Sequence, residues 1–203
     1  MGKAETKKTA KKTDTKKLVG VALFTAIVVV LQLVGGSIKV GIFSISLVLV
    51  PIVIGAALYG TKAGAWLGFV FGLAVLLSGD AAAFLAVNVV GAIIVCLAKG
   101  ILAGLCAGLV YKAIEKKNGT IAVIASAVTC PVVNTGVFLL GCVIFFMETI
   151  SGWAETFGFG SNVAAYMIFG MVGVNFLIEL VVNIVLAPVI VQLIKIGRKS
   201  KIG

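Results

Sequence analysis

The chain consists of long hydrophobic segments separated by short stretches that carry most of the charged residues. The first segment, 18–34, has no charged residue and follows a lysine-rich N-terminus. At about 1.5 Å per residue it crosses most of a hydrocarbon core of about 30 Å. Five similar segments follow, each with at most one charged residue, at 40–61, 63–79, 81–111, 118–147 and 163–194. This pattern predicts an all-α integral membrane protein with six transmembrane helices.

Several of these segments contain residues that disturb a helix. Pro51 lies in the middle of the second segment and predicts a kink, or a helix that begins near Leu47. The fourth segment is longer than one helix needs, so 81–88 is expected to form an outer loop or a re-entrant segment. Residues 148–162 are polar, aromatic and glycine-rich, which predicts an interfacial loop. Interruptions of the fifth segment are expected at Pro131, Asn134 and Thr135.

Glycines recur at every fourth position in two of the segments. The first stripe is Gly60, Gly64, Gly68 and Gly72, and the second is Gly100, Gly104 and Gly108. Residues four apart share one face of a helix, and glycine there lets a second backbone approach closely. Each stripe therefore predicts a tight contact with a neighbouring helix, in the same chain or in a partner.

The basic residues predict the orientation of the chain. Except for Lys39 and Lys99, they all fall in four segments that alternate with the outer loops: 1–17, Lys62, 112–118 and 195–203. Because basic loops stay in the cytoplasm, both termini are expected there. We expect a disordered basic tail at 1–17, a membrane domain at 18–194 and a second basic tail at 195–203. A cleaved signal peptide is the less favoured interpretation, because the first hydrophobic segment is longer than usual.

The composition excludes several functional classes. The chain is 61% hydrophobic with a mean hydropathy of +1.23, outside the range of soluble domains. Its net charge of +10 lies mostly at the ends, which indicates contact with lipid headgroups and not with nucleic acid. The sequence has no histidine, no phosphate-binding GxxxxGK[ST] loop and no recognisable nucleophile pair. We therefore expect no enzyme activity, no cofactor and no metal site.

The polar residues inside the hydrophobic segments are the candidates for function. Asn175, Glu179 and Asn183 follow at steps of four and share one helix face, and Lys99 is the one basic residue deep in the membrane. Ionisable groups there line polar cavities or pair with one another. Substrate contact is one interpretation, and a Lys99–Glu179 pair with ordinary interhelical hydrogen bonds is the other. The same alternatives hold for Asn88, Asn134 and Thr135.

Three stretches of the chain resemble a known transporter family. They are ALFTA at 22–26, SISLVLVPIVIGAALYGTKAGAWLGFVFGL at 44–73 and KGILAGLCAGLVYK at 99–112. They are similar to the substrate-binding S-components of energy-coupling-factor (ECF) vitamin transporters, and the resemblance covers nearly the whole chain apart from the first 17 residues. The AxxxA motif is weak and the stretch 51–72 is more distinctive. Thr61 departs from the proline of many relatives, which affects only a turn.

The resemblance implies a function and a set of partners. An S-component binds its vitamin with high affinity and docks on a transmembrane coupling subunit that two ATPases serve, in the cell membrane of a prokaryote. It implies that Ala22 and Ala26 form the docking surface, with Val19 and Val30 a turn away on the same face. It also places Asn175 and Glu179 where the sixth helix of the family contacts substrate.

The substrate stays open at this level. The stretch NFLIELVVNIVLAP at 175–188 is most similar to pantothenate-type S-components, with riboflavin-type relatives next. Pantothenate requires a cation for its carboxylate, which Lys99 or Lys39 can supply. Riboflavin requires aromatic stacking, and a cationic substrate would pair with Glu179. The aromatic candidates for stacking are Trp153, Phe157 and Tyr166.

Two other classes of function fit parts of the pattern. A structural or assembly protein of the membrane would use the glycine stripes for oligomerisation and would bind no ligand. A proton-coupled carrier would use Glu179 as its proton site and would work without an ATPase.

Overall fold

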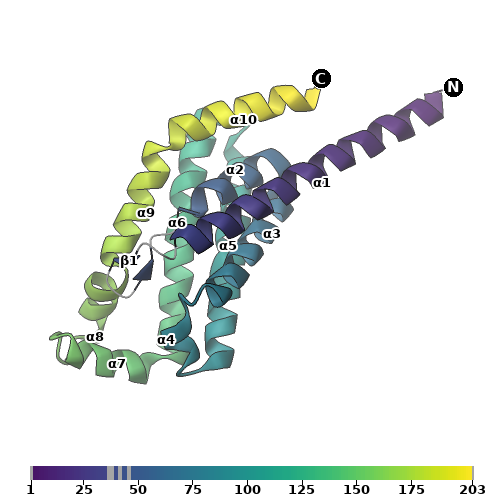
Figure 1. Ribbon diagram of the computed structural model, residues 1–203. Helices are drawn as coiled ribbons and strands as arrows, with labels where there is room; N and C mark the ends of the chain where they lie inside the picture. Colours follow the sequence, from purple (N-terminus) through teal and green to yellow (C-terminus); the bar gives the residue numbers. More distant parts are fainter. Residues whose placement is uncertain (1, 36–38, 41–42, 45–46, 203) are drawn as a thin grey trace.

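The computed structural model describes residues 2–35, 39–40, 43–44 and 47–202, and nearly all of them are helical. The helices form an elongated bundle in which both termini lie at one end and α4 and α7 at the other (Figure 1). The elements are α1 Gly2–Gly35, β1 Lys39–Val40, β2 Phe43–Ser44, α2 Leu49–Tyr59, α3 Thr61–Leu77, α4 Ala82–Leu85, α5 Val89–Ile114, α6 Gly119–Phe145, α7 Met147–Thr156, α8 Val163–Ala165, the π-helix η1 Tyr166–Val172, α9 Gly173–Val185 and α10 Ala187–Ile202.

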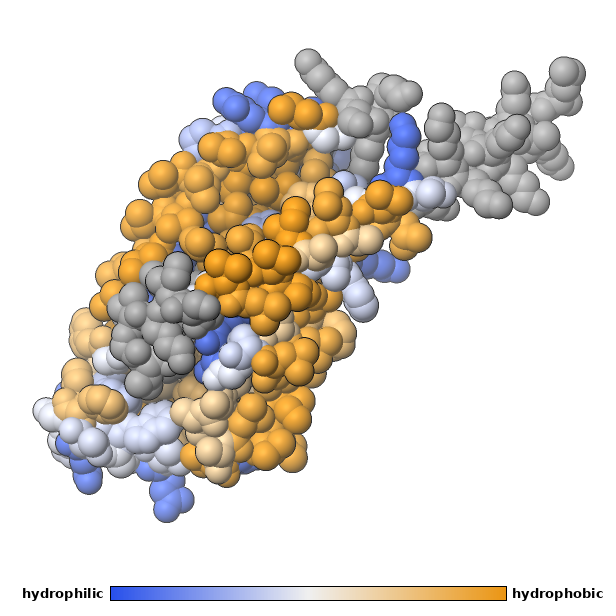
Figure 2. Space-filling view, viewed as in Figure 1, coloured by the Kyte–Doolittle hydropathy of each residue, from blue (hydrophilic) through white to orange (hydrophobic). Residues whose placement is uncertain are grey.

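The all-α class is confirmed, apart from a minimal hairpin in which Lys39 pairs with Ser44 and Val40 with Phe43. Within the described residues, four helical segments are long and apolar enough to cross a membrane: Thr15–Gly35, Val89–Ile114, Gly119–Phe145 and Val163–Val185. The helices α2 and α3 are shorter, with 11 and 17 residues. On the face that Figure 2 shows, most of the flank is hydrophobic, and hydrophilic residues gather at the two ends and in a small patch at mid-height. Because α2 and α3 are this short, six complete crossings of the membrane remain a prediction.

Helix α1 differs from the expected disordered tail. It runs without a break from Gly2 to Gly35, so most of 1–17 continues the helix of the hydrophobic segment. A helix is costly to start and easy to extend. The lysines and alanines of this stretch have good helix propensity, so they extend a helix that the apolar segment has already started.

The three prolines of the chain have two different consequences for its helices. Helix α2 begins at Leu49, two residues after the expected start, and Pro51 sits in its first turn, where its missing N–H costs no hydrogen bond. Pro188 lies in the first turn of α10 and marks the break after α9, so 163–194 is not one helix. Pro131 is fully buried inside α6, which continues past it. The predicted interruption of the fifth segment was wrong, because burial in the core outweighs one lost helix bond.

The expected interfacial loop at 148–162 is mostly helical. Helix α7 covers its first part and buries Ile150 and Ala154, which lie one turn apart on one face. That apolar face packs in a cluster that also contains Phe84 and Phe146. The polar residues that suggested a loop therefore belong to the outer face of a surface helix.

The two glycine stripes face each other between α3 and α5. A Cβ placed on Gly68 would collide with the carbonyl oxygen of Gly100, and one placed on Gly100 would collide with that of Gly68. Gly64 and Gly104 oppose each other in the same way. Gly60 is different, because it joins α2 to α3 with a φ of 93° and its Cβ would meet nothing within 4 Å. The stripes therefore serve packing inside this chain.

Candidate ligand-binding pocket

A pocket that is open on one side lies among α1, α3, α4, α5, α6, η1 and α9, and its empty space of about 690 Å³ includes the open mouth. Five of the six predicted substrate residues line it together. The lining residues are Gln32, Val75, Asp80, Ala81, Phe84, Cys96, Lys99, Asn134, Thr135, Phe138, Met171, Val172, Asn175, Phe176 and Glu179.

Helix α9 supplies an amide and a carboxylate from one face. Asn175 and Glu179 lie one turn apart, and both line the cavity. The next residue on this face, Asn183, is 1% exposed and donates its Nδ2 to the Glu179 carbonyl oxygen at 2.8 Å. Asn183 therefore ties to its own helix, while the other two residues face the pocket.

Lys99 lies in the wall of the cavity between two aromatic rings. Its Nζ is 5.4 Å from the centroid of Phe71 and 5.4 Å from that of Phe138. A cation is attracted to the face of an aromatic ring when it lies within about 6 Å of the centroid. The two rings therefore offer the ammonium a favourable setting inside the bundle. The predicted Lys99–Glu179 pair stays a prediction.

Two amide oxygens in the pocket have no hydrogen-bond partner. They are Oδ1 of Asn134, a residue 6% exposed on α6, and Oδ1 of Asn175 on α9. A buried acceptor without a partner costs free energy, about 1–3 kcal/mol in protein mutants. Both residues line the same cavity, so a ligand with N–H or O–H groups can satisfy both oxygens there.

The sequence interpretation missed a polar pair on the opposite wall. Gln32 of α1 is 2% exposed and donates its Nε2 to Oδ2 of Asp80 at 2.5 Å. The same amide lies 3.4 Å from the hydroxyl oxygen of Ser78. Asp80 lies in the turn between α3 and α4, and it also lines the cavity. Gln32 was detectable, because it is the one amide side chain in the apolar segment 18–34.

Asn88 lies outside the lining of this pocket. It is the N-cap of α5, and its Oδ1 accepts the backbone N–H of Gly91 at 2.9 Å. An N-cap side chain satisfies one of the N–H groups that a helix leaves free at its start. The structure therefore accounts for Asn88 without a ligand.

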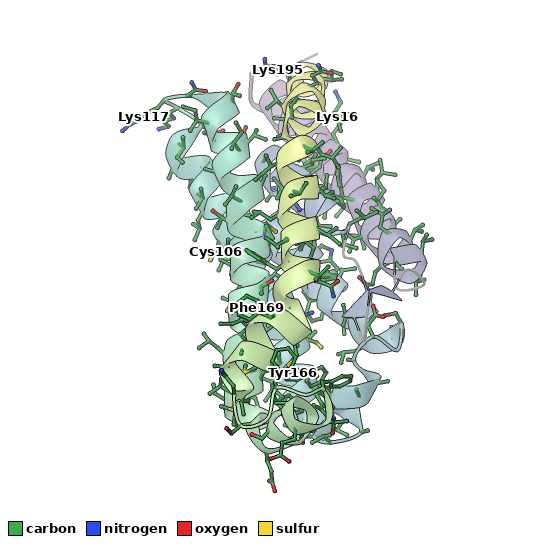
Figure 3. All side chains as sticks on the ribbon, turned by 90° about the vertical axis from the view of Figure 1, so that its left-hand side faces the viewer. Lys16, Cys106, Lys117, Tyr166, Phe169 and Lys195 are labelled. Carbon is green, nitrogen blue, oxygen red and sulfur yellow. The ribbon has the colours of Figure 1, made fainter. Side chains whose placement is uncertain are left out.

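The aromatic residues suggested for stacking a flavin pack against one another. The rings of Phe157 and Tyr166 stack at 5.7 Å between centroids with an interplanar angle of 11°. Trp153 packs on Phe84 at 5.6 Å. Figure 3 shows Tyr166 near the end of the bundle opposite Lys16 and Lys195. The aromatic side chains that line the cavity are Phe84, Phe138 and Phe176.

The other predicted surface lies on the outer side of α1. Ala22 and Ala26 are exposed, and Val19 and Val30 on the same face are 62% and 56% exposed. Val28, which points to the other side of the helix, is fully buried. The small residues therefore form a shallow outward-facing strip that no part of the described chain covers.

Comparison with known proteins identifies one family. The family model described as "ECF transporter, substrate-specific component" matches residues 16–191. No curated protein and no solved structure gives a match. The match includes every residue that lines the cavity and the strip on α1.

Proposed function

Since the chain belongs to the family of ECF transporter substrate-specific components, we propose that it binds a small water-soluble vitamin with high affinity for import. The family is a class of transport proteins and not of enzymes. Its members work with an ECF module of coupling and ATPase subunits. The energy for uptake by this chain would therefore come from a partner.

The observation that carries this proposal is the convergence of polar side chains in one cavity inside an apolar bundle. Lys99, Asn134 and Glu179 come from three different helices, and each belongs to a hydrophobic segment. Polar groups are expensive inside a membrane and are placed there for pairing or for ligands. The free amide oxygens of Asn134 and Asn175 favour a ligand.

The proposed orientation has both termini in the cytoplasm and six membrane-inserted helical segments. Lys16, Lys117 and Lys195 lie at the same end of the bundle (Figure 3). Positive residues favour the cytoplasmic side. We place the protein in a prokaryotic cell membrane, with the end formed by α4 and α7 on the outside.

Ala22 and Ala26 are the proposed docking surface for the transmembrane coupling subunit. Their exposure on an outward-facing strip of small residues supports this role, because such strips let two membrane helices approach closely. If the chain were a structural or assembly protein, its glycine stripes would form contacts between chains. In this structure the two stripes instead pack against each other, between α3 and α5 of the same chain. The proton-coupled alternative differs in one measurable respect, since it requires no ATPase for uptake.

The proposal is tested by the small molecules that the purified chain retains. The full-length protein is purified in mild detergent and denatured, and the released compounds are identified by mass spectrometry, with pantothenate and riboflavin as the first standards. A stoichiometric vitamin that rebinds, and that binds more weakly to Asn175→Ala, supports the proposal. A folded protein that retains no vitamin and binds none of a vitamin panel contradicts it.

A further inference from the structure

The charges and hydrogen-bonding groups of the cavity narrow the class of ligand, on the premise that the proposed function holds. Its lining contains two carboxylates, Asp80 and Glu179, against the single ammonium of Lys99. The amide oxygens of Asn134 and Asn175 add two acceptors that have no partner. The lining therefore contains more carboxylate groups than cations, together with two amide oxygens that a ligand donor can reach.

The one cation of the pocket already has electron-rich partners. Lys99 lies 5.4 Å from each of two ring centroids, Phe71 and Phe138. A ligand carboxylate would compete with these rings for the ammonium and would lie in the same cavity as two carboxylates. Like charges in a cavity of low dielectric repel strongly, so an anionic ligand is poorly matched.

The apolar part of the lining contains three aromatic rings, those of Phe84, Phe138 and Phe176. Phe84 and Phe138 contact each other edge to face, with centroids 5.5 Å apart, and Phe176 lies on α9 one residue after Asn175. Aromatic walls bind planar rings by stacking and by edge contacts. The amide oxygens in the same cavity then select rings whose edges carry N–H or O–H groups.

We infer that this pocket binds a neutral or cationic heteroaromatic compound with several hydrogen-bond donors, and rejects vitamins that are carboxylates. Asn134 and Asn175 accept the donors of the ligand, and Glu179 supplies the negative charge that favours a cation or a polarised N–H group. The ammonium group of Lys99 forms part of the pocket wall and does not bind an anionic group of the ligand. The sequence resembles S-components for pantothenate and for riboflavin. Of these two vitamins, riboflavin belongs to this class of ligand and pantothenate does not.

The test is a set of affinities for the full-length chain in detergent, with riboflavin and thiamine as neutral and cationic probes, and pantothenate and biotin as carboxylate probes. We expect riboflavin or thiamine to bind at least about 100-fold more tightly than either carboxylate, since two mismatched polar groups each cost about tenfold. In Glu179→Gln the favoured probe should bind about tenfold more weakly, because hydrogen bonds to a charged acceptor are the stronger ones.

Lys99→Met tests the charge balance of the pocket, because methionine keeps an unbranched side chain and removes the single ammonium of the lining. It should weaken the carboxylate probes further and strengthen thiamine, whereas Thr156→Ala, at an exposed hydroxyl outside the lining, is the control that should leave all four affinities unchanged. Pantothenate or biotin as the tightest ligand, with binding lost in Lys99→Met, would overturn the inference and leave the proposed function standing. A folded protein that binds none of the four probes nor any other vitamin contradicts the proposed function itself.

Discussion

Gly68→Ala should loosen the contact between α3 and α5 more than its single added methyl group suggests. The new Cβ would lie closer to the carbonyl oxygen of Gly100 than real Cβ atoms come to any atom. The obstacle is backbone, so no side chain can rotate to make room. The two helices must move apart along the rows of glycines, and the contacts of Gly64 and Gly72 with α5 weaken with them.

The magnitude follows from the cost of overpacking. One extra methyl group in a packed interior costs about 1–3 kcal/mol. Replacing glycine by alanine also stabilises a helix in water by about 1 kcal/mol, which partly hides the effect. Gly136→Ala carries the same propensity gain without the collision, because a Cβ on Gly136 of α6 would meet nothing within 4 Å. The difference between the two variants therefore isolates the collision.

Thermal unfolding in detergent measures this difference. Cys130 and Cys142 are fully buried, so a thiol-reactive fluorophore reports their exposure as the bundle opens. At about 2–4 °C per kcal/mol for a chain of this size, Gly68→Ala should unfold about 2–12 °C below Gly136→Ala. Equal midpoints for the two variants would show that the glycines of α3 and α5 do not make the contact described here.

Three further outcomes are expected. Asn88→Ala should lower the unfolding midpoint, because it removes an N-cap worth about 0.5–2 kcal/mol. It should leave ligand affinity unchanged at a temperature where the variant is folded. A loss of affinity in the folded variant would restore Asn88 as a substrate residue. Ser126→Ala removes a buried hydrogen bond of 2.7 Å to the Ala107 carbonyl oxygen and should lower the free energy of unfolding by about 1 kcal/mol. Thr156→Ala, at an exposed hydroxyl, should lower it little in the same assay. Similar losses in the two variants would contradict a stabilising role for the buried hydrogen bond. Ala22→Leu should reduce ATPase-dependent uptake and leave vitamin binding intact, whereas Ala164→Leu, also at an exposed alanine, should affect neither; unchanged uptake in Ala22→Leu would remove the docking role.

The sequence predicted much of the pocket because membrane residues obey a strong constraint. Lys99, Asn134, Thr135, Asn175 and Glu179 stand out as polar groups in apolar segments, and such groups must face a cavity or one another. Asp80 could not be assigned in this way, because the end of a hydrophobic segment does not reveal how deep a charge lies. Its place in the wall depends on Gln32, which lies 48 residues away in the chain.

Helix boundaries were less predictable, and the prolines show why. Pro51 and Pro188 begin helices, whereas Pro131 lies inside one, although all three are flanked by apolar residues. The local sequence gives each proline the same missing N–H. Pro51 and Pro131 are both buried, so burial alone does not separate them either. The outcome depends on where each helix can begin within the packed bundle, and this information comes only from the fold.

The opposed glycines of α3 and α5 also restrict how this protein can move. Carbonyl oxygens of Gly64 and Gly68 on α3, and of Cys96, Gly100 and Gly104 on α5, lie against glycines of the opposite helix. The glycines repeat every four residues, which is about 6 Å along the axis. Small sliding steps would drive carbonyls onto residues that have side chains, so the pair has one register and no nearby alternative. Helices α3 and α5 therefore travel as a single body that carries Val75, Cys96 and Lys99 of the pocket wall. Any opening of the cavity must come from the elements around this pair, of which α1, α6 and α9 carry polar groups of the lining.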